Sequence, residues 1–576
     1  MTSTHAARSP LSPAVIGPSG AVDYRRLFGQ AERFSADLIA AGVEPGSLVA
    51  VDSPRDLGAV VAALAVWRSD AAYIMLDPEH PDEWRARVAE RSGASHYVAV
   101  SATQGHDGTA KWNAEIRILS TAQRAPDPRH AYTIMTSGSA GQQKGVVVRR
   151  DNVDWLLHSA TEELGLTGED VFTCVHSLAF DFSVWEIYAP LFLGGRVVLV
   201  DRESVRSPHR LSEVLRQHGV TVLSATPQLF YALLEHWREN GVPPTLHTVV
   251  LGGDRLDPAR IPWELLSDPP SLRVANLYGI TETTVHVTCG LIGPESVKGP
   301  PGGILAPGTA SPIGWALPGA RVSLRDSSGR QVPVGELGEI WVGGDGVADG
   351  YLGDPRRTAR VFVPDPEGRG ARAYRSGDLA RLGGDGILYY EGRIDNEIKV
   401  RGHRVAPQQL ESLLRRYPGV RDAAVGLLDG GSGGSLTAVI VAPEPFDEAK
   451  LFDYLRDAVP PYLMPSRILR RLSLPITTNG KLDRSQLFFG HEAGQSGELA
   501  AGSPVESVVA DCWTAVLGHR EFGLDTTFFE CGGDSLLGIR VISRIKKATG
   551  RSVPVEYLFE GGTVRGMAQL IGETHE

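Results

Sequence analysis

Short apolar runs alternate with longer stretches of helical spacing through the first two thirds of this 576-residue chain. The strand-like runs are only a few residues long and mostly apolar: residues 48–51, 73–76, 196–200 and 248–251. Helical periodicity is clear at residues 24–41 and 212–218. Alternation of this kind predicts an α/β fold with largely parallel sheets up to about residue 390.

The pattern changes twice toward the C-terminus. From residue 392 to about residue 487 the elements are shorter, with a strand-like run at 436–441 and the turn dipeptide Asn479-Gly480, which predicts a small α+β domain. Residues 490–504 are rich in Gly, Ala, Ser and charge and lack apolar periodicity, which is typical of a flexible linker. Beyond them apolar residues recur at helical spacing, so a small helical bundle is expected there.

Charge and cysteine content exclude several classes of protein. The chain carries 57 Lys and Arg against 68 Asp and Glu, a net charge of −11, without a basic run that could follow a phosphate backbone. Its four cysteines form no CxxC pair, which argues against a zinc knuckle or a disulfide framework. No signal peptide is evident, and the apolar run at 57–67 is shorter than the about twenty residues of a membrane span. We therefore expect a soluble cytoplasmic protein that binds neither nucleic acid nor membranes.

A loop rich in Gly and Ser, TSGSAGQQKG at residues 136–145, lies between two apolar runs. Backbone N–H groups and hydroxyls in such a loop can bind an anion. The loop does not match the P-loop pattern GxxxxGK[ST], because Gln143 precedes Lys144 and Gly145 follows it. A solvated turn remains the alternative interpretation of this motif alone.

Further motifs follow the loop in a fixed order: FDFSVWE at 180–186, NLYGITETT at 276–284, GELGEIWVGGDGVADGYL at 335–352, YRSGD at 374–378, GRIDNEIKVRGHRV at 392–405 and NGKLDR at 479–484. Together they resemble the adenylate-forming superfamily, and within it the adenylation domains of nonribosomal peptide synthetases, over nearly all of residues 20–488. DTTFFECGGDSLL at 525–537 is similar to the phosphopantetheine attachment site of a peptidyl carrier protein. The resemblance implies an α/β adenylation core at 1–392, a mobile α+β C-terminal subdomain at 393–488, a linker at 489–503 and an all-α four-helix carrier domain at 504–576.

The resemblance also implies a site for ATP and Mg²⁺. In such enzymes a carboxylate attacks the α-phosphorus of ATP, so the protein supplies mainly positioning and positive charge. The implied catalytic residues are Lys481, Glu282, Arg401 and Arg404, with Glu282 holding Mg²⁺ and Asp395 as the hinge of the mobile subdomain. The implied ATP-binding residues are Thr136, Ser137, Gly138, Ser139, Lys144, Gly253, Asn276, Tyr278, Thr281, Asp378, Tyr390 and Arg393.

An amino-acid pocket follows from the same resemblance. Asp181 corresponds to the aspartate that pairs with the substrate's α-ammonium group, although a helix cap is its alternative role. The other implied pocket residues are Phe182, Trp185, Ser224, Val250, Gly252, Leu277, Val285 and His286, together with Lys481. This set resembles the pattern for threonine activation, in which Asn, Ile and Met usually stand at Ser224, Val250 and Leu277. Valine, 2-aminobutyrate and serine stay open, as does the alternative that His286 is a core histidine bonded to backbone.

Ser535 is the implied attachment point for 4'-phosphopantetheine. A competing interpretation, the GDSL block of a serine esterase, is disfavoured because only about forty residues follow it. We therefore expect a free-standing enzyme that activates an amino acid, most plausibly L-threonine, and loads it on Ser535. Its implied partners are a phosphopantetheinyl transferase, a condensation or tailoring enzyme in trans, and an MbtH-like protein. The alternatives are an acid:CoA ligase using free CoA, and a non-enzymatic docking module.

Overall fold

The computed structural model describes residues 9–78, 80–104, 110–119, 127–136, 143–267, 272–293, 311–368, 370–394, 398–400, 403–405, 407–428, 435–442, 446–471, 474, 487, 503–517, 520, 522–528, 535–551, 553–554, 557–558 and 562–572. Contacts divide these residues into two compact units, one up to residue 404 and one from residue 405 onward. The sequence pattern places its boundary slightly earlier, between residues 392 and 393.

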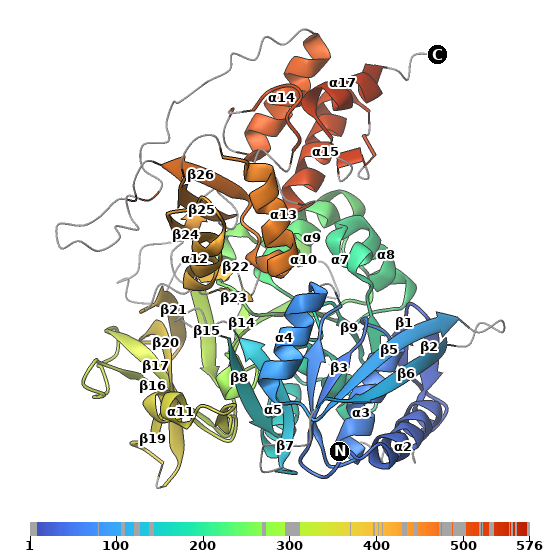
Figure 1. Ribbon diagram of the computed structural model, residues 1–576, viewed down its shortest axis with the longest axis vertical. Helices are drawn as coiled ribbons and strands as arrows, with labels where there is room; N and C mark the ends of the chain where they lie inside the picture. The colour runs from blue at the N-terminus through green and yellow to red at the C-terminus, as the bar shows by residue number, and fades with distance from the viewer. Residues whose placement is uncertain are drawn as a thin grey trace. The chain divides into compact units, whose positions relative to one another are not determined.

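A seven-stranded sheet forms one layer of the first unit (Figure 1). Its strand order is β18(Gly350–Tyr351), β8(Lys144–Arg149), β7(His130–Thr136), β4(Ala72–Leu76), β3(Leu48–Asp52), β5(His96–Gln104) and β6(Ala110–Ile118). The four strands from β7 to β5 run parallel, as the alternating pattern predicts. Helices α2(Tyr24–Ala40) and α3(Leu57–Arg68) lie side by side, and α3 contacts four strands of this sheet. The predicted apolar run at 57–67 is therefore a core helix.

A second, 14-stranded sheet begins with parallel strands. In spatial order these are β1(Pro13–Gly17), β10(Arg196–Leu199), β9(Val171–Cys174), β11(Val222–Ala225), β12(Thr248–Leu251) and β13(Arg273–Tyr278), with β2(Gly20–Asp23) antiparallel at the edge. Alternate residues of these strands face two different hydrophobic clusters, because successive side chains of a strand point to opposite faces. One cluster includes helix α6(Phe182–Leu193), and the other includes α8(Pro208–Gln217) and α9(Pro227–Asn240).

The rest of this sheet is antiparallel, which corrects the prediction of largely parallel sheets for the last part of the first unit. The strands are β14(Thr288–Ile292), β15(Ser311–Ala316), β21(Leu388–Arg393), β20(Arg372–Leu382), β17(Leu337–Gly344) and β16(Ala320–Arg325), with β19(Phe362–Pro364) paired to β20. Parallel neighbours need a crossover of a dozen or more residues, whereas only five residues join β20 to β21. Short connections therefore require hairpins here. The remaining helical elements of this unit are α4(Asp82–Ser92), α5(Arg150–Glu163), α7(Arg202–Arg206), η1(Pro258–Arg260), α10(Trp263–Leu266), η2(Thr281–Thr283) and α11(Pro355–Val361).

The second unit contains an α+β part and a helical part. In the α+β part, the strands β24(Asp422–Leu428), β25(Ser435–Val441) and β26(Arg467–Arg471) form a small sheet accompanied by α12(Pro407–Arg416), α13(Glu448–Ala458) and η4(Pro461–Leu463). Strand β25 covers the predicted run at 436–441. Just before this part, β22(Ile398–Val400) pairs with β23(His403–Val405). The turn at Asn479-Gly480 lies outside the described residues, as does almost all of the predicted linker.

The helical part consists of α14(Pro504–Leu517), α15(Ser535–Thr549) and α17(Val564–Gly572), packed side by side (Figure 1). Their core is built around Trp513 and Phe528, whose rings meet edge to face with centroids 4.9 Å apart. The described residues define three helices where four are predicted, and the stretch between α15 and α17 is described only in part. Across the described segments, every helix falls short of the length or the apolar character needed to span a membrane.

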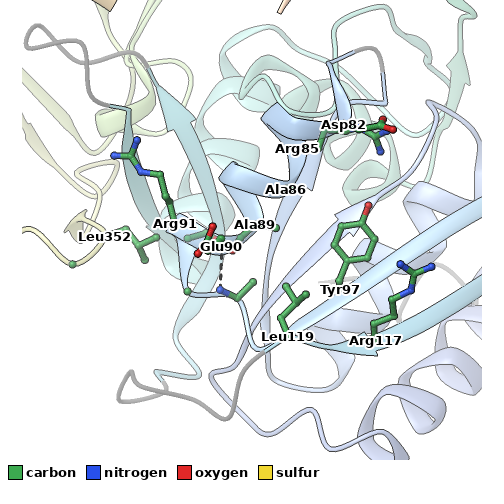
Figure 2. Close-up of a pocket in the computed structure, with 14 residues that line it drawn as sticks. Asp82, Arg85, Ala86, Ala89, Glu90, Arg91, Tyr97, Arg117, Leu119 and Leu352 are labelled. Atoms are coloured by element: carbon green, nitrogen blue, oxygen red, sulfur yellow. Dashed lines mark hydrogen bonds and ion pairs between the residues drawn. The ribbon is translucent and has the colours of Figure 1, made fainter. Parts of the chain in front are cut away.

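A groove of about 910 Å³ lies in the first unit, beside helix α4 (Figure 2). Helix α4 lines one side, and the labelled Tyr97, Arg117 and Leu119 come from strands β5 and β6 and the residue after β6. Leu352, just after β18, closes another side. None of the residues lining this groove belongs to the predicted ATP or amino-acid site.

Candidate active site

The predicted site residues gather where the parallel strands of the 14-stranded sheet end. Gly252 and Gly253 follow β12, Tyr278 is the last residue of β13, and Asp181 comes shortly after β9. In open α/β sheets, ligands bind in the crevice at the carboxyl ends of the strands. The topology therefore brings to one edge residues that are about a hundred positions apart in the sequence.

Asp378 is the centre of a buried polar cluster on β20. Its side chain is fully buried, and it lies opposite Arg393 in the pairing of β20 with β21. Arg393 Nη1 donates to Asp378 Oδ1 over 2.7 Å, and the Tyr278 hydroxyl donates to Asp378 Oδ2 over 2.7 Å. Each carboxylate oxygen has two lone pairs, so a further acceptor position remains on each for a ribose hydroxyl. The cluster thus fits the ribose-binding role that the resemblance implies.

Other predicted ATP-binding residues lie around this cluster. The Tyr390 ring on β21 is 6.1 Å from the Tyr278 ring, centroid to centroid. Asn276 on β13 donates from Nδ2 to the Pro312 carbonyl over 2.7 Å, which fixes its amide. Gly253 has φ +80°, a conformation that glycine adopts without strain.

Lys144 and Glu282 meet although 138 positions separate them. Lys144 Nζ donates to Glu282 Oε1 over 2.7 Å, and both side chains are almost fully buried. The Tyr351 hydroxyl donates to the same Glu282 oxygen over 2.8 Å, and Lys144 Nζ also donates to the Tyr351 oxygen over 3.0 Å. Thr136, the last residue of β7, is paired with Lys144 at the start of β8. The start of β8 therefore brings Lys144 to the acidic residue predicted to hold Mg²⁺.

The donor set around Glu282 fits a magnesium ion shared with a nucleotide. Mg²⁺ in such sites is usually held by one or two carboxylates together with substrate phosphates. Among the residues that the structure describes, no group of three or more His, Cys, Asp and Glu side chains could hold a metal by itself. Glu282 offers one carboxylate, so phosphate oxygens would have to complete the coordination.

Asp181 is buried at the N-terminal end of α6, with 6% of its surface exposed. It makes no side-chain capping bond to the helix, which argues against the alternative role as a cap. Burial raises the pKa of Asp181 to about 6, and the nearby Glu282 adds to this, while hydrogen bonds from Thr281 and the Phe182 backbone oppose it. A buried carboxylate is stabilised by a cationic partner, which is what an α-ammonium group would provide.

Three of the predicted pocket residues share one face of the sheet. Ser224 on β11 is in register with Val250 on β12, and Leu277 lies on the next strand, β13. Val250 and Leu277 belong to the same hydrophobic cluster as Phe182 and Trp185 of α6. These predicted pocket residues thus pack together where α6 meets the sheet.

Several buried polar atoms at these same positions have no hydrogen-bond partner. Among the described residues, neither His286 Nδ1 nor Nε2, nor Ser224 Oγ, nor Trp185 Nε1 has a hydrogen-bond partner. All three residues are at least 98% buried. Such atoms cost about 1–3 kcal/mol each when unpaired, so their presence in one pocket is the mark of a binding site rather than of a packed core. The alternative that His286 bonds to backbone is not what the structure describes.

The segment that carries His286 has a strained backbone. Thr284 and Val285 have φ of +61° and +66°, which β-branched residues rarely adopt. The backbone of Gly279 lies close against the Val285 carbonyl. Only glycine fits at position 279, because a Cβ there would lie 1.9 Å from the Val285 carbonyl oxygen. The Thr284 hydroxyl donates to the Gly346 carbonyl over 2.7 Å and so supports the turn. Strain of this kind is typical of functional sites.

Outside the described residues lie Ser137, Gly138, Ser139, Asp395, Arg401 and Lys481. For Arg404 and Ser535 only the backbone is described, as part of β23 and as the first residue of α15.

Sequence reasoning missed three residues around the site, of which Tyr351 and Glu186 are buried and His176 is partly buried. Tyr351 bonds to both Lys144 and Glu282, and His176 and Glu186 form a pair next to Phe182. Glu186 could have been suspected, because it is an isolated acid in the apolar stretch of α6. Tyr351 could have been suspected too, because it lies near the end of the motif at 335–352.

Comparison with known families assigns the two parts of the chain. Residues 2–352 match the AMP-binding enzyme family. The chain belongs to that family. Residues 507–571 match the phosphopantetheine attachment site family, so this adenylating ligase of the nonribosomal peptide synthetase type carries a carrier domain at Ser535 and its surroundings. The pair at Lys144 and Glu282 lies within the matched residues, and the buried cluster at Asp378 lies beyond them in the same compact unit.

Relatives support the same two-part organisation. The chain is 35% identical over 592 residues to the dimodular nonribosomal peptide synthase of Bacillus subtilis, covering 98% of this chain but spanning only 25% of that protein. It is 32% identical to syringomycin synthase SyrB1 of Pseudomonas syringae pv. syringae, covering 99% of this chain and 94% of the relative. Among solved structures, holo-PA1221, an NRPS protein containing adenylation and PCP domains, superposes with a TM-score of 0.80 and 27% identity, covering 99% of this chain and 95% of the other.

Proposed function

We propose that this adenylating ligase activates L-threonine with ATP and transfers the threonyl group to the thiol of a phosphopantetheine on Ser535. The observation that carries the choice of threonine is the set of unpaired polar atoms of His286 and Ser224 inside an otherwise apolar pocket. A substrate side chain with one hydroxyl and one methyl group would pair those atoms and fill the apolar part.

The protonation state of His286 supports a hydroxyl partner. Burial, with a smaller contribution from His176, lowers the pKa of His286 to about 3, so the imidazole is neutral near pH 7. A neutral imidazole has one donor and one acceptor nitrogen. A hydroxyl group can satisfy either, whereas the methyl group of valine would leave both unpaired.

The two ends of the amino acid would be held by opposite charges. Asp181 would pair with the α-ammonium group, and Lys481 with the carboxylate and the phosphates. ATP would be held by Asp378, Tyr278 and Lys144, and Mg²⁺, which supplies positive charge to the phosphates, by Glu282. A phosphopantetheinyl transferase would modify Ser535, and a condensation or tailoring enzyme in trans, with an MbtH-like helper, would act beside this chain.

Substrate preference tests the pocket. In pyrophosphate exchange we expect threonine to be preferred over valine, 2-aminobutyrate and serine, and over valine by at least about tenfold, because an unpaired buried polar group costs about 1–3 kcal/mol. His286→Ala should bring the threonine-to-valine ratio close to one. A matched control is His96→Ala, since His96 is equally buried but bonded at both nitrogens, to Ser95 and to the Ala41 carbonyl. A wild-type enzyme that prefers valine would refute the proposal.

A second prediction concerns the nucleotide. Asp378→Asn should raise the KM for ATP by roughly 10- to 100-fold, because hydrogen bonds to a charged group contribute about 1.5–3 kcal/mol. The KM for threonine should stay within about twofold of the wild type, since Asp378 does not line the amino-acid pocket. Pyrophosphate exchange at varied ATP and saturating threonine gives both constants. An unchanged KM for ATP would remove Asp378 from the proposed site.

A further inference from the structure

Glu186 is an unusual residue for the interior of α6. Its side chain is fully buried in a helix that is otherwise apolar, FSVWEIYAPLFL. It accepts hydrogen bonds from the Val175 and His176 backbone N–H groups, each over 3.2 Å, and lies 2.9 Å from His176 Nδ1. Three donors around one carboxylate fix the backbone and the ring of His176 at once.

The His176 backbone is also held from the other side. Arg55 donates from Nη1 to the carbonyls of Val175 and His176, and from Nε to the carbonyl of Val200. The N–H side of the segment after β9 is thus bound to Glu186 and its carbonyl side to Arg55. These hydrogen bonds hold the backbone on both sides and the ring at Nδ1, so the His176 imidazole has a single orientation.

In that orientation the His176 ring lies flat against Phe182. The two centroids are 4.4 Å apart and the planes differ by 17°. Phe182 in turn meets His286 edge to face, with centroids 4.8 Å apart and an angle of 84°. On another side Gly252 leaves just enough room, since a Cβ there would be 3.2 Å from Phe182 Cε1 and 3.5 Å from His286 Cε1. The Phe182 ring therefore lies in contact with both the His176 ring and the pocket histidine.

We propose that His176 and Glu186 are positioning residues for substrate discrimination: the pair presses the His176 ring against Phe182, and Phe182 holds the His286 imidazole where it recognises the substrate side chain. The inference rests on the proposed function, because it assigns to His286 the role of reading that side chain. Neither His176 nor Glu186 needs to touch the substrate. Loss of the flat ring would let Phe182 tilt into the vacated space and His286 follow it.

Two variants separate the ring from its hydrogen bond to Glu186. His176→Asn keeps a donor for Glu186, so no buried carboxylate loses its partner, but it removes the flat ring. The double variant His176→Phe with Glu186→Gln keeps a flat ring and removes the imidazole–carboxylate hydrogen bond. We expect His176→Asn to lower the ratio of kcat/KM for the best and second-best amino acids by on the order of tenfold, and the double variant to retain most of that ratio. The KM for ATP should change in neither.

A matched pair elsewhere in the same sheet provides the control. His247 Nε2 lies 2.8 Å from Asp170 Oδ1, just before β12 and β9, and so at the opposite ends of these parallel strands. His247→Asn should lower the melting temperature without changing the ratio of kcat/KM for the best and second-best amino acids. The ratio is measured by pyrophosphate exchange with a panel of amino acids, and folding by thermal unfolding.

Three results would contradict the positioning role of His176 and Glu186. An unchanged ratio in His176→Asn, or an equal fall in His247→Asn, would overturn the positioning role. A folded double variant that loses the ratio would also overturn it, because the flat ring would then be insufficient. The proposed function fails separately: if the wild type prefers an amino acid other than threonine, the ratio for that amino acid still tests His176.

Discussion

Replacing Asp181 with asparagine is expected to lower kcat/KM for the amino acid by roughly 100- to 1000-fold. The carboxylate is almost fully buried and has no capping bond to helix α6, so the substrate's ammonium group would be its main cationic partner. Removing one member of a buried ion pair costs about 3–5 kcal/mol, since the other charge stays unpaired. Asparagine keeps the shape and loses the charge, which isolates the electrostatic contribution.

Pyrophosphate exchange at varied amino acid and saturating ATP measures this loss. Asp170→Asn is a suitable control, because Asp170 is buried to the same extent, 6% exposed, but lies at the opposite ends of the strands. That control should lose stability rather than kcat/KM. An Asp181→Asn enzyme with wild-type kcat/KM would show that the ammonium group is bound elsewhere.

The same carboxylate predicts how activity depends on pH. Burial raises the pKa of Asp181 from 3.8 to about 6 in the folded protein, and only the ionised form attracts an ammonium group. We expect kcat/KM for the amino acid to rise about tenfold per pH unit below 6 and to level off above it. Stability should change in the opposite direction: the folded state holds this proton more tightly than the unfolded chain, so the contribution of Asp181 to folding falls as the pH rises from about 4 to about 6.

Replacing Ser535 with alanine is expected to abolish carrier loading while leaving adenylation intact. Ser535 is the first residue of α15, within the part of the chain that matches the phosphopantetheine attachment site family. The phosphopantetheine is joined through a serine oxygen, so alanine offers no atom for the bond. Exchange activity should stay at the wild-type level, because the adenylation domain forms a separate hydrophobic core.

Intact mass after treatment with CoA and a phosphopantetheinyl transferase measures the modification. Ser543→Ala serves as the control, since Ser543 is an exposed serine on the same helix. The Ser543→Ala protein should gain the full phosphopantetheine mass and should then accept labelled threonine. Modification of Ser535→Ala at another residue would show that the attachment point is wrong.

Local patterns were sufficient for several of the elements. Alternating short apolar runs located β3, β4, β10 and β12, because buried parallel strands need continuous apolar residues whatever their partners are. The pattern failed from β14 onward, where strand direction depends on how short the connections are. The motif order also singled out Asp378 and Glu282, which the structure places in two buried polar clusters.

The amino-acid sequence by itself determined the class of enzyme, because that depends on ordered local motifs, and the same motifs predict the attachment serine and the positions that line the pocket. Only the tertiary structure decided which side chains meet. Lys144 reaches Glu282 across 138 positions, and Tyr278 reaches Asp378 across 100. The hydrogen bonding of His286 likewise depends on every neighbour that folding brings to it. Those neighbours decide whether its ring nitrogens are bonded, as in a core histidine, or unpaired. Hydrogen bonding and burial are properties of the packed chain, so no local pattern could reveal the unpaired imidazole or the ring of His176 behind it.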